Sequence, residues 1–124
     1  MKEKKDQETI EDLIILAVEC MNLAITIIDT QGTLLYYNKQ AAKILDRKPG
    51  YIGEDIQLHH HKATSNKTLD LMLRGFKEGR TAPFYYEAKP YGKTILVSLS
   101  PIVKDGYFIG CIQSVRLKKG TAPE

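Results

Sequence analysis

Three consecutive β-strands predicted in the last third of the sequence constrain its fold more than any other feature. The predicted strands, rich in β-branched and aromatic residues, are Pro83–Lys89, Lys93–Val103 and Tyr107–Leu117. Turn sequences separate them, first Pro90-Tyr91-Gly92 and then Lys104-Asp105-Gly106. Ile95, Val97 and Leu99 occupy alternate positions of the middle strand, so their side chains should share one face. A chain that ends in this way is expected to bury one face of an antiparallel sheet.

The first two thirds of the chain supply two more predicted strands and the helices that would cover the sheet. Leu23–Asp29 and Thr33–Asn38 flank the turn Thr30-Gln31-Gly32, which predicts a hairpin. Asn38 is a good N-cap for a short helix over Lys39–Leu45. In a longer helix ended by Gly79, one face would consist of Leu69, Met72, Leu73 and Phe76. The order of elements predicts an α+β fold, a five-stranded antiparallel sheet with helices on one face. The expected core comprises Ile27, Ala42, Leu45, Leu69, Met72, Leu73, Phe76, Ile95, Val97 and Leu99.

An amphipathic helix is predicted near the N-terminus, over about residues 9 to 22. Thr9 and Asp12 have the spacing of a capping box. The apolar residues at helical spacing are Leu13, Ile14, Ala17, Val18 and Met21, with Ile15 and Leu16 on another side. This helix either packs on its own domain or forms the contact of a homodimer, and its surplus of apolar surface favours the dimer. The expected organisation is a disordered N-terminus over 1–8, this helix over 9–22, a globular domain over 23–117 and a tail over 118–124.

Composition excludes several classes of function. A chain of 124 residues is about one domain long, and its net charge of +3 comes from scattered basic residues, which does not indicate a nucleic-acid-binding face. No run approaches the roughly 18 apolar residues of a membrane span, and the first residues are too acidic and polar for a signal peptide. Cys20 and Cys111 are far apart, with no disulfide or zinc spacing. We therefore expect a cytoplasmic protein, and the absence of catalytic motifs indicates that it is not an enzyme.

Three stretches of the sequence together resemble the PAS domain sensor family. Ile27-Ile28-Asp29-Thr30-Gln31-Gly32, with the strand and the Asn38-capped helix that follow, resembles the opening of a PAS domain. Gly50–Ile56 resembles the short helices that come next, and Lys104–Gly110 the turn into the final strand. The resemblance covers about residues 22–117. It implies that the domain over 23–117 is a PAS sensor domain, a signalling module that senses something and passes the result to a partner.

The end of the last predicted strand departs from the family. Many PAS domains have Asp-Ile-Thr there, as a link to a downstream signalling helix, whereas this chain has Arg116-Leu117-Lys118. The resemblance therefore leaves two routes for the signal. Either a downstream partner or output domain lies outside this chain, or the protein signals by assembling with other copies.

The family binds flavin, haem, other chromophores, small acids or nothing, and the residues narrow this choice. The photoactive flavin and linked-chromophore classes need a cysteine in the middle of the chain, but residues 21 to 110 contain none. Gln57-Leu58-His59-His60-His61-Lys62 instead holds all three histidines. It resembles the Leu-His-Pro-x-Lys-Ser motif in haem-binding PAS domains of carbon-monoxide-responsive transcription regulators. Leu58, His59 and Lys62 match, while His60 and Ala63 depart from the motif.

This local resemblance implies a haem whose iron is bound by His59, since a neutral imidazole is a good axial ligand. The expected pocket walls are Leu58, Leu69, Met72, Ile95, Val97 and Ile112. Met72 or Cys111 could fill the sixth site, or it could stay open to a diatomic gas. Lys62, Lys67 or Arg74 would meet the propionates, and Asp55 or a backbone carbonyl would hold the second ring nitrogen of His59. The alternatives are an exposed polar loop, a zinc site using His59 and His61, a ligand-free dimerisation module, or a domain binding another small molecule.

Overall fold

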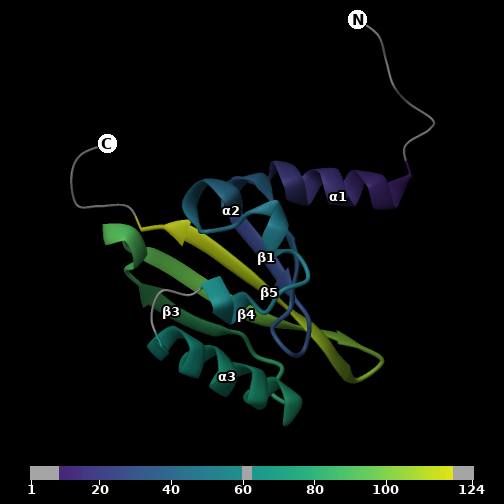
Figure 1. Ribbon diagram of the computed structural model, residues 1–124. Helices are drawn as coiled ribbons and strands as arrows, with labels where there is room; N and C mark the ends of the chain where they lie inside the picture. The colour runs from purple at the N-terminus through teal and green to yellow at the C-terminus, as the bar shows by residue number, and fades with distance from the viewer. Residues whose placement is uncertain (1–8, 60–62, 119–124) are drawn as a thin grey trace, which may run out of the picture.

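The computed structural model describes residues 9–59 and 63–118 of the chain, which form a five-stranded antiparallel sheet with its helices (Figure 1). The strands are Ala24–Ile28 (β1), Leu34–Tyr37 (β2), Phe84–Ala88 (β3), Ile95–Lys104 (β4) and Tyr107–Leu117 (β5). Their order across the sheet is β2-β1-β5-β4-β3. The two halves of the chain meet where β1 pairs with β5, from Ala24 opposite Val115 to Ile28 opposite Cys111. The predicted α+β fold is confirmed.

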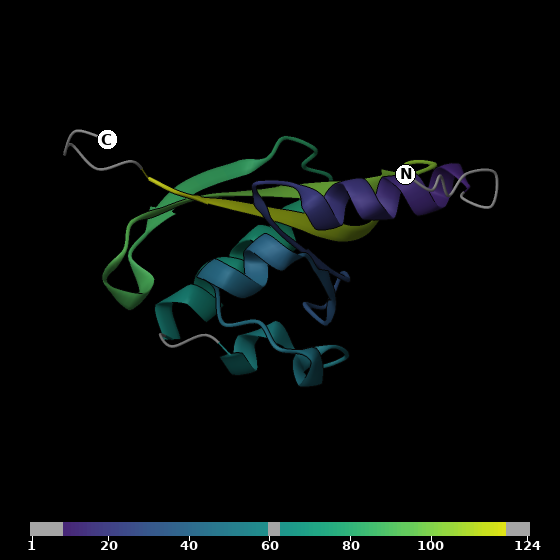
Figure 2. The same ribbon diagram turned by 90° about the horizontal axis from the view of Figure 1, so that it is seen from above.

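The helical segments are α1 (Ile10–Cys20), α2 (Lys39–Ile44), α3 (Ala63–Lys77) and the 3₁₀ turns η1 (Pro49–Tyr51), η2 (Ile56–His59) and η3 (Pro90–Gly92). Those between β2 and β3 connect the two halves of the chain and cover one face of the sheet. Figure 2 shows α2, α3 and the turns between them on the same side of the sheet, whereas α1 lies outside this layer and meets α2 at one end. Because β2 and β3 are the two sheet edges, the segment from α2 to α3 crosses the whole covered face.

The core lies between this helical layer and the sheet, in two clusters of buried side chains. One cluster consists of Ile28, Leu34, Ile56, Leu69, Met72, Leu73, Phe76, Leu99 and Cys111. The other consists of Ala24, Ala41, Ile95, Val97 and Val115, with Leu45 packed against it. Seven of the predicted core residues are buried as expected: Leu69, Met72, Leu73, Phe76, Ile95, Val97 and Leu99.

Two predicted core residues lie elsewhere. Ile28 is buried and Ile27 is not, because Ile28 shares the inner face with Thr26 and alternation turns Ile27 outward. Ala42 is exposed, whereas Ala41 is buried. The short helix α2 directs only the residue three positions after its N-cap, Ala41, fully into the core.

The turn between β1 and β2 is held by Asp29. One carboxylate oxygen accepts hydrogen bonds from the backbone N–H groups of Gln31, at 2.8 Å, and Thr33, at 2.9 Å. Burial by itself raises the pKa of Asp29, but the hydrogen bonds from Thr33 and Gln31 outweigh it and the pKa is lowered. Gly32 follows with a φ of 90°, in the left-handed region that glycine adopts without strain.

Candidate functional site

His59 ends η2, in a segment fastened to β2 by backbone hydrogen bonds. The N–H of Leu34 donates to the carbonyl of Glu54, and the N–H of Gly53 donates to the carbonyl of Leu34, both at 2.8 Å. The N–H of Ile56 donates to the carbonyl of Gly32 at 2.9 Å. These bonds place η1 and η2 against the start of β2, so His59 stands at a fixed position beside the core.

The imidazole of His59 has two close partners, an acid and an aromatic ring. Its Nε2 lies 2.8 Å from Oε1 of Glu54. Since a carboxylate only accepts, this nitrogen donates its proton there. The ring stacks on Tyr51, with 3.3 Å between ring centroids and 10° between the planes. Tyr51 in turn packs against the core cluster and donates from its hydroxyl to Asp46 at 3.3 Å. The side chain of His59 is thereby only 15% exposed, with Glu54 and Tyr51 as its partners.

The predicted haem walls divide between interior and surface. Leu69, Met72, Ile95 and Val97 are buried, although the first two belong to one core cluster and the last two to the other. Leu58, in the turn η2, is 71% exposed. Ile112 is 37% exposed, because it lies opposite Ile27 on the uncovered face of the sheet. The six residues therefore fall in two core clusters and on the surface, and their assignment to a haem pocket stays a prediction.

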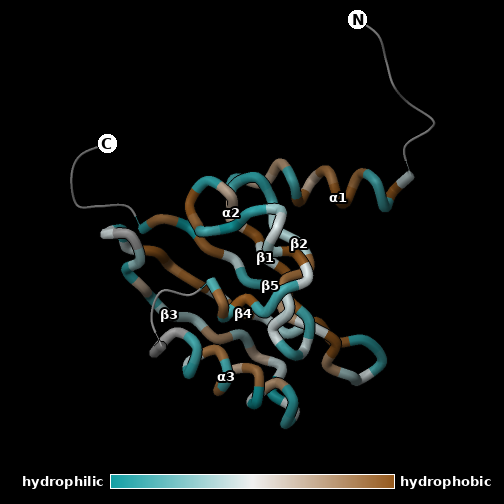
Figure 3. Tube along the Cα trace, in the orientation of Figure 1, coloured by the Kyte–Doolittle hydropathy of each residue, from teal (hydrophilic) through white to brown (hydrophobic). Residues whose placement is uncertain are grey.

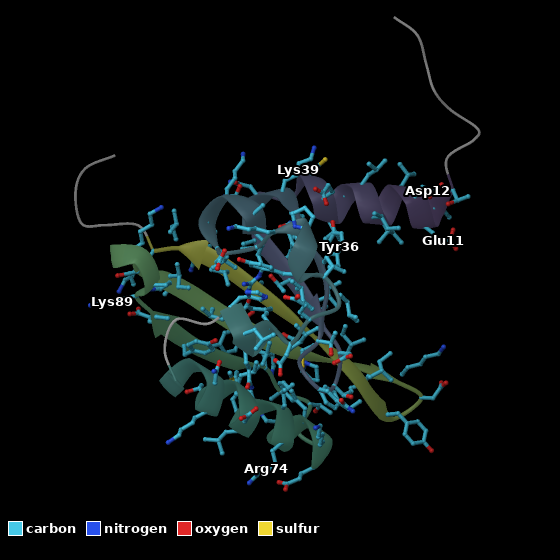
Figure 4. All side chains as sticks on the ribbon, in the orientation of Figure 1. Glu11, Asp12, Tyr36, Lys39, Arg74 and Lys89 are labelled. Atoms are coloured by element: carbon cyan, nitrogen blue, oxygen red, sulfur yellow. The ribbon has the colours of Figure 1, made fainter. Side chains whose placement is uncertain are left out.

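The other groups predicted around a haem are also spread over the molecule. Asp55 does not hold His59, because its carboxylate accepts from the N–H of Gln57 at 2.9 Å and Glu54 takes the expected role. Arg74 points away from the domain on α3 (Figure 4). Lys67 is exposed on the same helix. Cys111 is buried, and burial raises the pKa of its thiol to about 12.

Among the described residues, Nε2 of His59 already has Oε1 of Glu54 as its partner, at 2.8 Å. Within residues 9–59 and 63–118, no group of three or more His, Cys, Asp or Glu side chains could hold a metal ion. His60, His61 and Lys62 lie outside the described residues, as do the N-terminus 1–8 and residues 119–124 of the predicted tail.

Sequence reasoning missed a polar group on the covered face of the sheet. Arg47 is buried, and its Nε donates to the hydroxyl of Thr26 at 3.2 Å while one Nη donates to the side-chain carbonyl of Gln113 at 3.1 Å. Tyr86 joins them by a hydrogen bond with Gln113. Burial raises the pKa of Tyr86, against the opposing effects of Gln113 and Arg47. Contacts between residues so distant in sequence leave no local pattern.

The second candidate site is the attachment of α1 to the sheet. The capping box predicted at Thr9 and Asp12 is present, with both reciprocal hydrogen bonds. Asn38 caps α2 as predicted, accepting from the N–H of Ala41 at 3.0 Å. The same side chain also donates to the carbonyls of Val18 and Leu23, which the sequence pattern did not indicate. Asn38 therefore joins α1, β1 and α2.

Tyr36 makes a second connection to α1, and Figure 4 shows it beside that helix. Its hydroxyl donates to Oε1 of Glu19 at 2.5 Å. Burial and the carboxylate of Glu19 together raise the pKa of Tyr36 to about 12. The phenol therefore stays protonated and keeps donating at neutral pH.

Apart from Glu11 and Asp12 in the first turn, the exposed side chains of α1 are apolar. Figure 3 shows hydrophobic stretches along this helix, which extends beyond the sheet. Ile10, Leu13, Ile14, Ile15 and Leu16 are between 49% and 74% exposed. Of the residues that make up α1, none is buried. This is the largest concentration of exposed apolar side chains on any helix in the described part of the chain.

Comparison with known protein families identifies the family of this chain. The family described as PAS domain matches residues 16–114. The chain belongs to the PAS domain family. The resemblance read from its sequence motifs is thus confirmed for the PAS domain as a whole, a sensory and signalling module. The described helices of this PAS domain include none long and apolar enough to cross a membrane.

Solved structures share the fold of this PAS domain at low sequence identity. The PAS domain of BvgS from Bordetella pertussis gives a TM-score of 0.72 at 12% identity, covering 90% of this chain and 88% of that one. A PAS domain from Colwellia psychrerythraea gives 0.68 at 19% identity, covering 89% and 98%. The PAS domain of the histidine kinase ThkA gives 0.60 at 15% identity, covering 75% and 96%. Among curated proteins no match was found.

Proposed function

We propose that this PAS domain is a cytoplasmic, non-enzymatic signalling module that works as a homodimer paired through α1. Its signal would pass to a partner or output domain outside this chain. The observation that carries the proposal is the exposed apolar surface of α1, where Leu13, Ile14 and Ile15 are each more than half exposed. ThkA, whose PAS domain shares this fold, is a histidine kinase.

The energetics of α1 favour a partner. Burial of apolar surface contributes about 25 cal/mol per Å², so a helix that leaves its leucines and isoleucines in water forgoes that stabilisation. An isolated helix of 11 residues is marginal in water. A second copy of the chain would present the same apolar helix, and a two-fold pair buries one self-complementary patch on both subunits.

Haem-based gas or redox sensing is not part of this proposal. The motif that suggested it centres on His59, whose Nε2 faces Glu54 and whose ring lies on Tyr51. Two of the six expected pocket residues, Leu58 and Ile112, are at the surface. The proposed function is therefore assembly through α1, and the exposed apolar residues of that helix support it.

Sedimentation velocity over a range of protein concentrations tests the dimer. The wild-type chain should sediment as a dimer, and a Leu13→Glu/Leu16→Glu variant should sediment as a monomer, because buried carboxylates in the interface would be costly. Leu71→Glu is the matched control, since Leu71 is an exposed leucine on α3, and it should leave the dimer intact. A wild-type chain that stays monomeric at the highest concentration would overturn the proposal, as would a double variant that still dimerises.

A further inference from the structure

The side chain of Asn38 divides its hydrogen bonds between the body of the domain and α1. It is fully buried. Its Oδ1 accepts from the backbone N–H groups of Ile25 and Ala41, each at 3.0 Å. Its Nδ2 donates to the carbonyls of Val18, at 2.7 Å, and Leu23, at 2.9 Å. The acceptor end thus serves β1 and α2, while the donor end holds the last turn of α1 and the segment that follows it.

The position of α1 depends on few contacts. Figure 1 shows its C-terminal end against the domain and its N-terminal part extending away. None of the residues in α1 is buried, so packing contributes little to its placement. The carbonyls of a helix's last turn lack their regular partners within the helix, and the Val18 carbonyl accepts from the N–H of Met21, at 3.3 Å, and from Nδ2 of Asn38, at 2.7 Å. A helix this short needs such outside contacts to keep its place.

Tyr36 and Asn38 hold adjacent residues of α1 from alternate positions of the chain. Tyr36 binds the side chain of Glu19, and Asn38 binds the main chain of Val18. A single bond would leave α1 free to turn about its axis, whereas two bonds at neighbouring residues fix its rotation. That rotation determines which apolar residues of α1 face outward.

We propose that Asn38 is a positioning residue that latches α1 to β1 and α2 and thereby sets the geometry in which two copies of α1 pair. A displacement of α2 or of the start of β1 moves the carboxamide, and α1 moves with it. The covered face of the sheet is then connected to the dimer contact through the hydrogen bonds of three residues: Ala41, Asn38 and Val18. The second half of this inference rests on the proposed dimer, while the first half, the latch itself, does not.

The substitution Asn38→Asp separates the two ends of the carboxamide. Asp is isosteric and caps helices as well as Asn, so the bonds from Ile25 and Ala41 are retained. It replaces the Nδ2 donor by an oxygen that faces the carbonyls of Val18 and Leu23. In the Leu13→Glu/Leu16→Glu background, where pairing does not contribute, amide exchange from residue 17 to residue 20 should accelerate about tenfold or more. Exchange in β4 and β5 should stay within about twofold of the parent.

Asn38→Ser is the second variant, because serine still caps α2 but offers no donor that reaches both carbonyls. If Asn38→Asp does not fold, the exchange measurement is made with Asn38→Ser alone. Faster exchange confined to α1 in either folded variant supports the latch. Unchanged α1 exchange in both, or equal acceleration in α1 and the sheet, would overturn it, since Asn38 would then be only a structural residue of the core.

The link to assembly is measured separately, by sedimentation of Asn38→Asp with Leu13 and Leu16 intact. The dimer dissociation constant should rise about tenfold, because α1 loses its fixed orientation. An unchanged constant alongside faster α1 exchange would overturn the claim that the latch sets the pairing geometry. A monomeric wild-type chain would instead refute the proposed function, and the exchange result would still decide the latch.

Discussion

The imidazole of His59 lies face to face on the ring of Tyr51, with 3.3 Å between the centroids and 10° between the planes. The same imidazole donates through Nε2 to Glu54, at 2.8 Å. Iron coordination through Nε2 would break the bond to Glu54 and expose a carboxylate to the porphyrin. Contacts among the three side chains instead hold η1 against η2. The histidine that the sequence motif singles out therefore has a structural role.

This arrangement predicts that His59 does not bind haem. Titration of the apoprotein with hemin should give the same absorption spectrum for the wild type and for His59→Ala, without a Soret band that depends on this residue. A sharp, shifted Soret band in the wild type that is lost in His59→Ala would contradict the prediction and restore the haem hypothesis. His59→Ala should lower the stability of the domain by about 1 kcal/mol through loss of the contacts with Glu54 and Tyr51.

The sequence was most informative where the decisive contacts are local. The capping box at Thr9 and Asp12 and the N-cap at Asn38 join residues three positions apart, so the residue types alone indicated them. The side of the sheet on which Ile112 lies was not indicated, because alternation shows that neighbours face opposite sides without showing which side is covered. That choice follows from the pairing of Ile112 with Ile27 across β1 and β5, which depends on the register of strands far apart in the chain.

In the candidate sites, too, local features could be predicted from the sequence and long-range contacts could not. Acids near His59 were visible in the sequence, but the turn geometry of η2 decided for Glu54 against Asp55. The donor end of Asn38 reaches Val18, 20 residues away, and no spacing rule anticipates a side chain that bonds a main-chain carbonyl at that distance. The apolar surplus of α1, by contrast, was visible because it is a property of one segment.

The helix α3 offers a matched pair of leucines to test the core. Leu73 is 5% exposed within the larger core cluster, whereas Leu71 is 65% exposed on the same helix. Leu73→Ala should lower the free energy of unfolding by about 2–5 kcal/mol, since it leaves a cavity among packed side chains. Leu71→Ala should change it by less than about 0.5 kcal/mol. Urea denaturation followed by circular dichroism measures both, and similar losses in the two variants would show that the helix packs differently.

Gly110 in β5 tests the contact between the two halves of the sheet. A Cβ at this position would lie 2.8 Å from the carbonyl oxygen of Ile28 in β1, closer than two such atoms can approach. Gly110→Ala should therefore destabilise the domain by about 1–3 kcal/mol, since the strands must shift to admit the methyl group. Gly50→Ala is the control, because a Cβ there meets nothing within 4 Å. Equal unfolding midpoints for the two variants would be evidence against the close pairing of β1 with β5.

The stability that Tyr36 contributes should depend on pH, and the direction of this dependence follows from its raised pKa. Burial and the Glu19 carboxylate raise the pKa of Tyr36 from 10.0 to about 12 in the folded protein. Folding therefore favours the protonated phenol, and the hydrogen bond to Glu19 contributes fully below pH 10.0 and is lost as the pH rises toward about 12.

At neutral pH, Tyr36→Phe should cost about 1 kcal/mol of unfolding free energy, because it removes this bond. The difference between wild type and variant should shrink above pH 10.0. Tyr85→Phe, which alters an exposed tyrosine of β3, should show neither effect. A Tyr36→Phe penalty that stays constant from neutral pH to about pH 12 would mean that the hydroxyl does not donate to Glu19.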